Sequence, residues 1–358
     1  MDLVRVTSFS ADHNGHGGNR RTAQIAELVN SINLEIQDVP EFSSSRFKRY
    51  YHGFLFTLKH SLKVSSYRSF GYYGTQFLKY QSFLKSYNGK KILLWEDTRH
   101  PLTSLIAQSL GFKVIALPQN IESLVSYEGD TLTQVSLAKR LDGELKSLLR
   151  SNAVFCISRE EQWLLRLQGV NADFLPYYPP KFVFESLLEV RKVRSQSSKC
   201  KFLIIGTAGN SPTLLGMIEQ IQWLQAISSK YKFQVDIAGY GTEQLDKHCN
   251  NPAFTVHGSV SFEKLRILMI RAKAVLIHQV PTSGALTRIP EMLIAGIPVI
   301  ANNNACRSSF GYAGVYIYDN LRELSDLITK ELSMPPILNR PLSAEKRFID
   351  CVQQFSDS

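Results

Sequence analysis

The chain has 358 residues, of which 44% are apolar and 20% are charged. Roughly 150 residues make one domain, so this length predicts about two domains, each with room for a buried core. The composition is typical of a globular protein and excludes fibrous, collagen-like and intrinsically disordered classes.

The cysteines and the first residues bear on the cellular compartment. Five cysteines are scattered along the chain without a Cys-x-x-Cys pair, which argues against a disulfide framework and a zinc cluster. The first residues contain no apolar signal core, and no apolar run reaches the roughly 18 residues of a spanning helix. We therefore expect a cytoplasmic protein.

In chain order, short apolar runs predict the strands. They cover residues 3–9, 91–97, 113–120 and 153–159 in the first half, and 201–209, 233–241, 274–280 and 297–303 in the second. Helical patterns lie between them at residues 21–32, 101–111 and 213–227. This alternation predicts an α/β protein with two doubly wound parallel sheets, each buried on both faces.

The proline-rich segment after residue 175 suggests a domain boundary. We expect a first domain over residues 1–178, a linker over 179–200 and a second domain over 201–340. Residues 341–358 follow, and Phe348, Val352 and Phe355 share one face of the helix predicted there. That helix is expected to pack on the body of the protein.

The net charge of +10 is spread unevenly. No acidic residue lies between Glu41 and Glu96, whereas ten Lys and Arg do, and Phe and Tyr are interleaved with them. This mixture fits anionic lipid headgroups, acidic polymers or nucleic acid. The alternative is that the aromatic side chains pack in the core while the Lys and Arg are merely solvated.

Several catalytic motifs are missing from the sequence. There is no Walker loop, His-Glu-x-x-His, Gly-x-Ser-x-Gly or Asp-x-Asp. The first glycine-rich turn contains Gly17 and Gly18, but Arg20 stands where a dinucleotide fingerprint needs a third glycine. Gly17 and Gly18 could still bring the N-terminus of a helix close to an anionic ligand. The alternative is an ordinary strand-to-helix turn.

The second half has a denser pattern, because polar and glycine residues follow four predicted strands. They are Thr207, Gly209 and Asn210, then Gly239 and Tyr240, then His257, and finally Thr282, Ser283 and Gly284. Open α/β sheets bind ligands at the carboxyl ends of their strands. These loops therefore predict one shared binding site.

Residues 272–302 carry a resemblance to a known family. A strand, a glycine turn, a helix containing Glu291 and then Ala-Gly-Ile-Pro-Val-Ile resemble the donor-binding signature of GT-B glycosyltransferases of the family 4 type. The likeness covers most of the chain, strongly from Lys201 to Ala301. It implies two Rossmann-like domains that face each other across a cleft, with the C-terminal helix crossing back to the first domain. It also implies sugar transfer from a nucleotide sugar, with retention at the anomeric carbon.

The resemblance also assigns roles to the donor site. The backbone N–H groups of Ser283, Gly284 and Ala285, at the start of a helix, would hold the diphosphate together with Arg288. Glu291 would accept hydrogen bonds from the ribose. Without Asp-x-Asp, the transfer is expected to be metal-independent, with a UDP- or GDP-linked donor as substrate and no further cofactor. The alternative for Arg288 and Glu291 is an ion pair on a helix surface.

The acceptor site is expected in the first half. Polar residues at predicted strand ends there are the catalytic candidates, since a carboxylate among them would assist deprotonation of a hydroxyl acceptor. They are Glu96, Asp97, His100, Asn120 and Glu122. Each could instead be structural: Asp97 could cap the following helix, as Ser158 could cap another.

Two other classes of function stay open. Ser283 stands where many members of the family carry a further glutamate, so a catalytically inactive nucleotide- or glycan-binding protein is one alternative. A nucleic-acid-binding protein is the other, although no RNP or helix-turn-helix signature is present. For an active enzyme we expect a glycan, lipid-linked or polymer acceptor. Residues 42–95 would then attach it peripherally to the anionic inner face of the membrane through Arg46, Lys48, Arg49, Lys59, Lys63 and Arg68.

Overall fold

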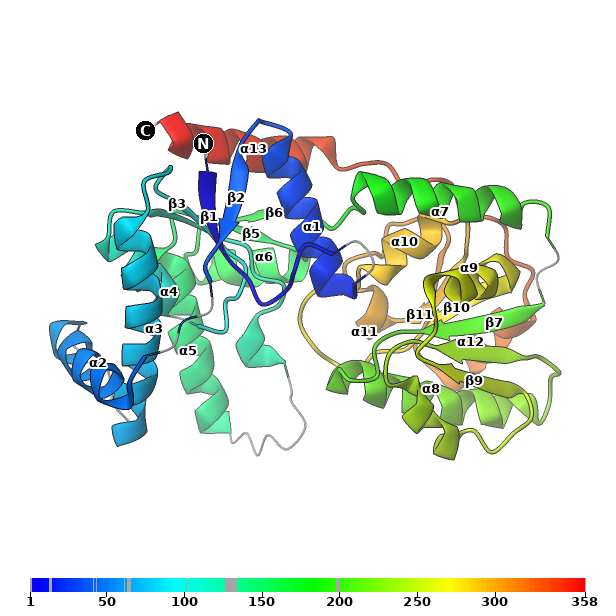
Figure 1. Ribbon diagram of the computed structural model, residues 1–358. Helices are drawn as coiled ribbons and strands as arrows, with labels where there is room; N and C mark the ends of the chain where they lie inside the picture. The colour runs from blue at the N-terminus through cyan, green and yellow to red at the C-terminus, as the bar shows by residue number, and fades with distance from the viewer. Residues whose placement is uncertain are drawn as a thin grey trace.

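The computed structural model describes residues 2–12, 15–40, 42, 44–60, 62, 66–100, 102–125, 134–197 and 200–357. Over these residues the chain forms two six-stranded sheets with helices on both faces (Figure 1). All strand pairs are parallel. The prediction of two doubly wound α/β domains is confirmed. Within the described segments, no helix is long and apolar enough to cross a membrane.

The first domain has the strand order β2-β1-β3-β4-β5-β6. Its strands are β1 (Asp2–Val6), β2 (Glu35–Asp38), β3 (Ile92–Trp95), β4 (Lys113–Ala116), β5 (Ala153–Cys156) and β6 (Ala172–Phe174). Its helices are α1 (Gly17–Asn30), α2 (Arg46–His60), α3 (Tyr67–Ser86), α4 (Leu102–Ser109), η1 (Glu122–Leu124), α5 (Gln134–Arg150) and α6 (Arg159–Leu167). Every residue of β3 is buried, as expected for an inner strand covered on both faces.

The second domain has the strand order β12-β11-β10-β7-β8-β9. Its strands are β7 (Lys201–Ile205), β8 (Val235–Ala238), β9 (Phe254–Gly258), β10 (Ala272–Ile277), β11 (Val299–Asn302) and β12 (Val315–Tyr318). Its helices are α8 (Ser211–Ser228), η2 (Thr242–His248), α9 (Phe262–Arg271), α10 (Arg288–Ile294), α11 (Asn303–Cys306) and α12 (Leu321–Thr329).

Two further helices join the domains. Helix α7 (Lys181–Arg194) occupies most of residues 179–200, and its buried Val183, Leu187 and Val190 belong to the core of the second domain. Helix α13 (Leu342–Asp357) returns to the first domain, where Phe348 packs edge-to-face on Phe155 with ring centroids 5.3 Å apart. Figure 1 shows α13 running alongside α1 and the N-terminus. The end of the chain therefore helps to build the first core.

The strand order of each sheet reverses once. In the first sheet the reversal lies between β1 and β3, and in the second it lies between β7 and β10. Loops diverge at such a point and leave a crevice at the carboxyl ends of the strands. The topology therefore places Ser8 beside Asp97 in one domain, and Gly206 beside Gln279 in the other.

Candidate functional site

Arg288 lies at the strand-order reversal of the second sheet. Its guanidinium contacts Gly206, where a Cβ atom would come within 2.5 Å of Nη1. Its Nη2 donates to the Gln279 side-chain oxygen at 3.3 Å, whereas its buried Nε has no hydrogen-bond partner among the residues that the structure describes. Burial lowers the pKa of Arg288 to about 10, with no carboxylate opposing the shift. A cation without a counter-ion here is suited to an anionic ligand.

The structure excludes the alternative interpretation of Arg288 and Glu291 as a surface ion pair. Arg288 binds Gln279, and Glu291 is only 2% exposed. The two side chains therefore serve different contacts, although they lie three residues apart on α10.

The glycine loops of the second domain pack directly on one another. Gly239 has a φ of +135°, and a Cβ atom there would lie 2.0 Å from the Gly206 oxygen. The Ala208 N–H donates to the Tyr240 oxygen at 2.8 Å. The Gly209 backbone faces the Tyr240 ring, which is 72% exposed. Glycine is thus required for the close approach of these loops, and an aromatic face is left open to solvent.

The remaining predicted donor residues of β7 and β9 have structural partners. Asn210 caps α8 by accepting from the Thr213 N–H at 3.3 Å, and the Thr207 oxygen accepts from the Asn210 N–H at 3.2 Å. His257 instead pairs with buried Asp236 at 2.8 Å. The β8–β9 register shifts between Ile237 and Ala238, and a bulge of this kind re-aims side chains.

Glu291 of the second domain is bound by two residues of the first domain. Its Oε2 accepts from the Arg20 guanidinium of α1, and its Oε1 accepts from the Tyr177 hydroxyl at 2.6 Å. The Glu291 charge raises the pKa of Arg20, and burial raises that of Tyr177. Both carboxylate oxygens are therefore engaged, and the contact closes the cleft at this point.

The start of α1 faces the loop before α10. A Cβ atom at Gly17 would come within 2.6 Å of the Thr287 hydroxyl oxygen, and one at Gly18 would meet the Phe9 ring at 2.9 Å. The His16 side chain caps the helix by accepting from the Gly18 N–H at 3.2 Å. Gly17 thus allows the close approach of the two domains next to Arg20, whereas Gly18 makes room for the Phe9 ring within the first domain.

The loop containing Thr282, Ser283 and Gly284 docks on the first domain. The Ser283 hydroxyl donates to the Ile121 oxygen at 3.0 Å, and the Gly284 N–H donates to Glu161 at 2.8 Å. Asn120 lies against Gly284, since a Cβ atom there would be 2.1 Å from its side-chain oxygen. Thr282 is partly exposed in the same loop.

The expected helix N-terminus at residues 283–285 is a loop instead. Helix α10 begins at Arg288, and Gly284 has a φ of +81°, which a right-handed helix does not allow. The Gly284 N–H is also already bound to a carboxylate. The prediction of a helix start at residues 283–285 is therefore wrong, and the role of these amides in holding the diphosphate stays a prediction.

Glu161 of α6 is a buried carboxylate between the domains. Its Oε1 accepts from the N–H groups of Ile121 at 3.0 Å and Gly284 at 2.8 Å. Its Oε2 is buried and has no hydrogen-bond partner in the described part of the chain. Burial raises the pKa of Glu161 to about 7, although the two N–H groups oppose the shift. This group therefore titrates near neutral pH.

Asp97 and His100 lie at the strand-order reversal of the first sheet. Asp97 accepts from the Ser8 hydroxyl at 2.5 Å and from Arg99 Nε at 2.9 Å. Burial opposes its ionisation, but these hydrogen bonds lower the pKa of Asp97 overall. His100 Nδ1 is 2.9 Å from the Tyr72 hydroxyl, and burial lowers its pKa. An ionised carboxylate and a neutral imidazole thus share one edge of the sheet.

The other catalytic candidates of the first domain, Glu96, Asn120 and Glu122, have protein partners. Glu96 is 4% exposed and accepts from the Thr22 hydroxyl at 2.5 Å, with Arg5 3.8 Å away. Burial raises the pKa of Glu96, and Arg5 opposes this. Asn120 donates to Glu122 at 3.4 Å beside the docked Gly284 loop. Glu96 therefore belongs to a buried network, whereas Asn120 and Glu122 lie at the domain contact.

Three site residues were missed by the sequence analysis. Arg20 was considered only as the wrong residue for a third glycine, and Tyr177 fell at the expected domain boundary. Glu161 follows Ser158 in a capping-box pattern, and Ser158 does accept from its N–H at 3.1 Å. Its carboxylate nevertheless binds Ile121 and Gly284 instead of returning to the cap.

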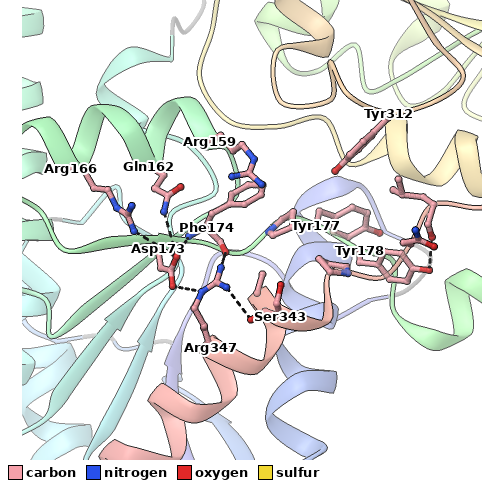
Figure 2. Close-up of a pocket in the computed structure, with 15 residues that line it drawn as sticks. Arg159, Gln162, Arg166, Asp173, Phe174, Tyr177, Tyr178, Tyr312, Ser343 and Arg347 are labelled. Carbon is pink, nitrogen blue, oxygen red and sulfur yellow. Dashed lines mark hydrogen bonds and ion pairs between the residues drawn. The ribbon is translucent and has the colours of Figure 1, made fainter.

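A cavity of about 480 Å³ lies on the other side of Tyr177, between α6, β6, α13 and the second domain. Arg159 stacks over the Phe174 ring at 4.4 Å, and Arg347 donates to Asp173 at 2.7 Å. Figure 2 shows Tyr312 reaching from the second domain toward Arg159. This cavity offers arginine and tyrosine groups, and its one carboxylate is already bound.

Solved structures match nearly the whole chain at low sequence identity. One is a trehalose-6-phosphate protein from E. coli bound with UDP-2-fluoro glucose, with a TM-score of 0.65, 11% identity, and coverage of 99% of this chain and 96% of the other. Another is sucrose-phosphate synthase from Thermosynechococcus elongatus, with a TM-score of 0.61, 14% identity, and coverage of 98% and 94%. The chain has the GT-B fold.

A third GT-B neighbour has another activity. It is UDP-GlcNAc 2-epimerase from Methanocaldococcus jannaschii in complex with UDP-GlcNAc and UDP, with a TM-score of 0.54, 14% identity, and coverage of 99% of this chain and 100% of the other. No protein-family model matches the sequence, and no curated protein does. In the described part of this GT-B protein, no group of three or more His, Cys, Asp or Glu side chains is placed to hold a metal ion.

Proposed function

We propose that the protein is a glycosyltransferase that moves a sugar from a UDP- or GDP-linked donor to a hydroxyl of a glycan, lipid-linked or polymer acceptor. The observation that carries the proposal is Arg288, a buried cation that has no carboxylate partner among the described residues and lies against Gly206 at the strand-order reversal of the second sheet. Fold neighbours whose structures contain UDP or a UDP-sugar support a donor of this class.

Arg288 would stabilise the leaving group. Breaking the bond to the anomeric carbon releases a nucleoside diphosphate, and its negative charge grows in the transition state. A guanidinium fixed in a water-poor site stabilises that charge without reorganising. The sequence lacks Asp-x-Asp, so we assign this role to arginine and propose metal-independent transfer.

The domain contact at Glu291 would change when the donor binds. In the structure both oxygens of Glu291 have protein partners, Arg20 and Tyr177. We propose that ribose hydroxyls take the place of Arg20 on Glu291, while Arg20 turns to a phosphate oxygen. Arg20 thus occupies the position on Glu291 that the ribose of the donor takes. Closure of the cleft around the donor then excludes water from the reacting groups.

Asp97 is the proposed base of the acceptor site. Its hydrogen bonds from Ser8 and Arg99 keep it ionised near neutral pH, so it can accept a hydroxyl proton from the acceptor. His100 stays neutral beside it and orients Tyr72. We propose overall retention at the anomeric carbon, as the family resemblance implies, with the acceptor hydroxyl attacking on the face from which the diphosphate leaves.

A donor panel tests the proposal. Purified protein is mixed with UDP-, GDP- and ADP-sugars, and the melting temperature identifies the donor by the stabilisation that a ligand of the folded state gives. Acceptor-dependent release of that nucleoside diphosphate, with the anomeric product assigned by NMR, supports the proposal. Conversion of the sugar without any acceptor would show epimerisation instead.

Ser283 favours a second candidate, a nucleotide-binding protein without catalysis. Its hydroxyl donates to the Ile121 oxygen, so this position offers no carboxylate beside a donor sugar. Such a protein would be stabilised by the nucleotide in the same panel yet release no product with any acceptor. The two candidates therefore differ in turnover and share the donor site.

A further inference from the structure

Helices α2 and α3 form a tightly crossed hairpin. A Cβ atom at Gly53 would come within 1.8 Å of the Phe70 oxygen, and one at Gly74 within 1.7 Å of the Arg49 oxygen. The two backbones therefore meet directly at these glycines. Because the crossing leaves no room for a side chain, it fixes which face of α2 turns inward, toward buried Phe56 and Thr57.

The opposite face of α2 carries a stripe of large apolar side chains in solvent. Its members, here called the α2 stripe, are Phe47 (80% exposed), Tyr51 (52%), Phe54 (47%), Leu55 (43%) and Leu58 (62%). Their spacing of four, three, one and three residues puts them on one side of a helix. An exposed apolar face of this size on one helix marks an interaction surface.

The α2 stripe is flanked only by positive charge. Arg46, Lys48 and Lys59 of the same helix are exposed, and no acidic residue occurs from 42 to 95. Lys63, also expected in this patch, lies outside the described residues. Figure 1 shows α2 at the outer edge of the first domain, away from the second domain, and no described residue covers the α2 stripe.

We propose that the α2 stripe docks on the surface of a bilayer rich in anionic phospholipid. An amphipathic helix with aromatic and aliphatic residues on one face and Lys and Arg at its borders lies in the plane of the interface. The apolar stripe enters the headgroup boundary, and the flanking cations face the lipid phosphates.

The charges favour lipid over a second copy of the chain. Two copies joined through the α2 stripe would bring Arg46, Lys48 and Lys59 of each near those of the other, without an acidic residue of residues 42–95 to offset them. Like charges opposed across a contact disfavour it. An anionic leaflet offers the complementary sign.

The hairpin is also connected to the candidate acceptor site. Tyr72 of α3 hydrogen-bonds with His100 at 2.9 Å, next to Asp97. Docking through α2 would therefore hold the acceptor side of the cleft near the lipid surface. The docking itself needs neither donor nor turnover, so it stands or falls independently of the proposed function.

Vesicle sedimentation of the full chain tests the proposal. Vesicles of phosphatidylcholine alone are compared with vesicles that also contain phosphatidylglycerol, at low and high salt. We expect the protein to pellet with the anionic vesicles at low salt and to be released by high salt, because the electrostatic contribution is screened.

Two double variants locate the contact. Phe47→Ser with Leu58→Ser removes apolar area, and Lys48→Glu with Lys59→Glu reverses two charges. Each should weaken binding to anionic vesicles by about tenfold or more. Matched controls are Phe310→Ser with Leu342→Ser, which are exposed apolar residues elsewhere, and Lys247→Glu with Lys346→Glu, exposed lysines of the second domain and α13. The controls should bind like the wild type.

Three results would overturn the proposal. The first is wild-type protein that stays in the supernatant with anionic vesicles at low salt. The second is equal loss of binding in the α2 variants and their matched controls. The third is a concentration-dependent dimer of the wild type that does not form in the Phe47→Ser, Leu58→Ser variant. That result would show that the α2 stripe mediates self-association. Circular dichroism of each variant checks its fold. We expect every variant to be folded, because all the changes are at exposed positions.

Discussion

The Arg20 guanidinium binds the Glu291 carboxylate across the two domains, although 271 residues separate them in the sequence. Tyr177 donates to the other carboxylate oxygen at 2.6 Å. A buried carboxylate thus has one partner from α1 and one from the segment that leaves β6. The contact joins the two domains at this point.

This relationship predicts strong coupling between Arg20 and Glu291. Arg20→Met leaves a buried carboxylate without its cation, which should cost about 3 kcal/mol of stability. Glu291→Met should also destabilise, but the double variant should lose clearly less than the sum of the two. Calorimetric unfolding measures the cycle, and small-angle scattering should show a larger radius of gyration for Arg20→Met. Additive losses with unchanged scattering would mean that the pair does not hold the domains.

Glu161 predicts a pH-dependent stability. Its pKa rises from 4.5 to about 7 in the folded protein, so between these values the folded state holds a proton that the unfolded chain has released. The free energy of unfolding should therefore fall as pH rises through this window, by up to about 3 kcal/mol.

Glu161→Gln should remove this dependence. The amide keeps an acceptor for Ile121 and Gly284 and never ionises, so the melting temperature should change less between pH 5 and pH 7.5 than in the wild type. Glu160→Gln is the matched control, because the neighbouring Glu160 is exposed and binds Ser308. A pH profile that is identical in wild type and Glu161→Gln would contradict the assignment.

If Asp97 is the base, its substitution should lower turnover without changing donor affinity. Asp97→Asn keeps the shape of the side chain and removes the base, so kcat should fall about 100-fold or more while donor affinity stays unchanged. Steady-state rates and donor titration measure the two quantities, with exposed Asp142→Asn as the control. Wild-type turnover in Asp97→Asn would exclude the carboxylate as the base.

The sequence predicts most of the fold because buried parallel strands leave continuous apolar runs. The runs at β3, β7 and β10 are of this kind. The loops after β7 and β8 were predicted from the glycines that follow these two runs. The edge strand β2 (Glu-Ile-Gln-Asp) carries no such run, since only Ile36 is partly shielded. Only the structure, in which β2 pairs with β1, shows its position in the sheet.

The site was less predictable because its contacts are long-range. The way in which the two domains meet determines which residue binds Glu291. The sequence around Arg20 contains no pattern that predicts this contact. His257 stands at the end of a predicted strand, where the β8–β9 register shifts, and its side chain binds Asp236. Arg288 was predicted from the family resemblance, but its lack of a counter-ion is a property of the packed structure.

Substitution of Arg194 and substitution of Arg288 should have different effects on the free energy of unfolding. Burial lowers the pKa of both to about 10. Arg194 donates to the carbonyl oxygens of Met269 and Ala272 at 2.7 and 2.6 Å, whereas Arg288 binds only the Gln279 side chain among the described residues. Arg194→Met should lower the free energy of unfolding by about 3 kcal/mol.

Arg288→Met, in contrast, should leave the melting temperature unchanged or raise it, because it replaces a buried, uncompensated cation by an apolar side chain. Residues kept at a cost in stability are typical of functional sites. A large loss of stability in Arg288→Met would instead indicate a structural role. Thermal unfolding of the two variants side by side measures the difference.

The most direct test of the account is calorimetric titration of UDP and GDP into wild-type protein and Arg288→Met. The account predicts that the wild type binds one of these nucleotides and that Arg288→Met weakens its affinity by about tenfold to 100-fold at an unchanged melting temperature. The exposed Arg322→Met serves as the control and should bind like the wild type. Equal affinity of wild type and Arg288→Met would contradict the assignment of the donor diphosphate to this arginine.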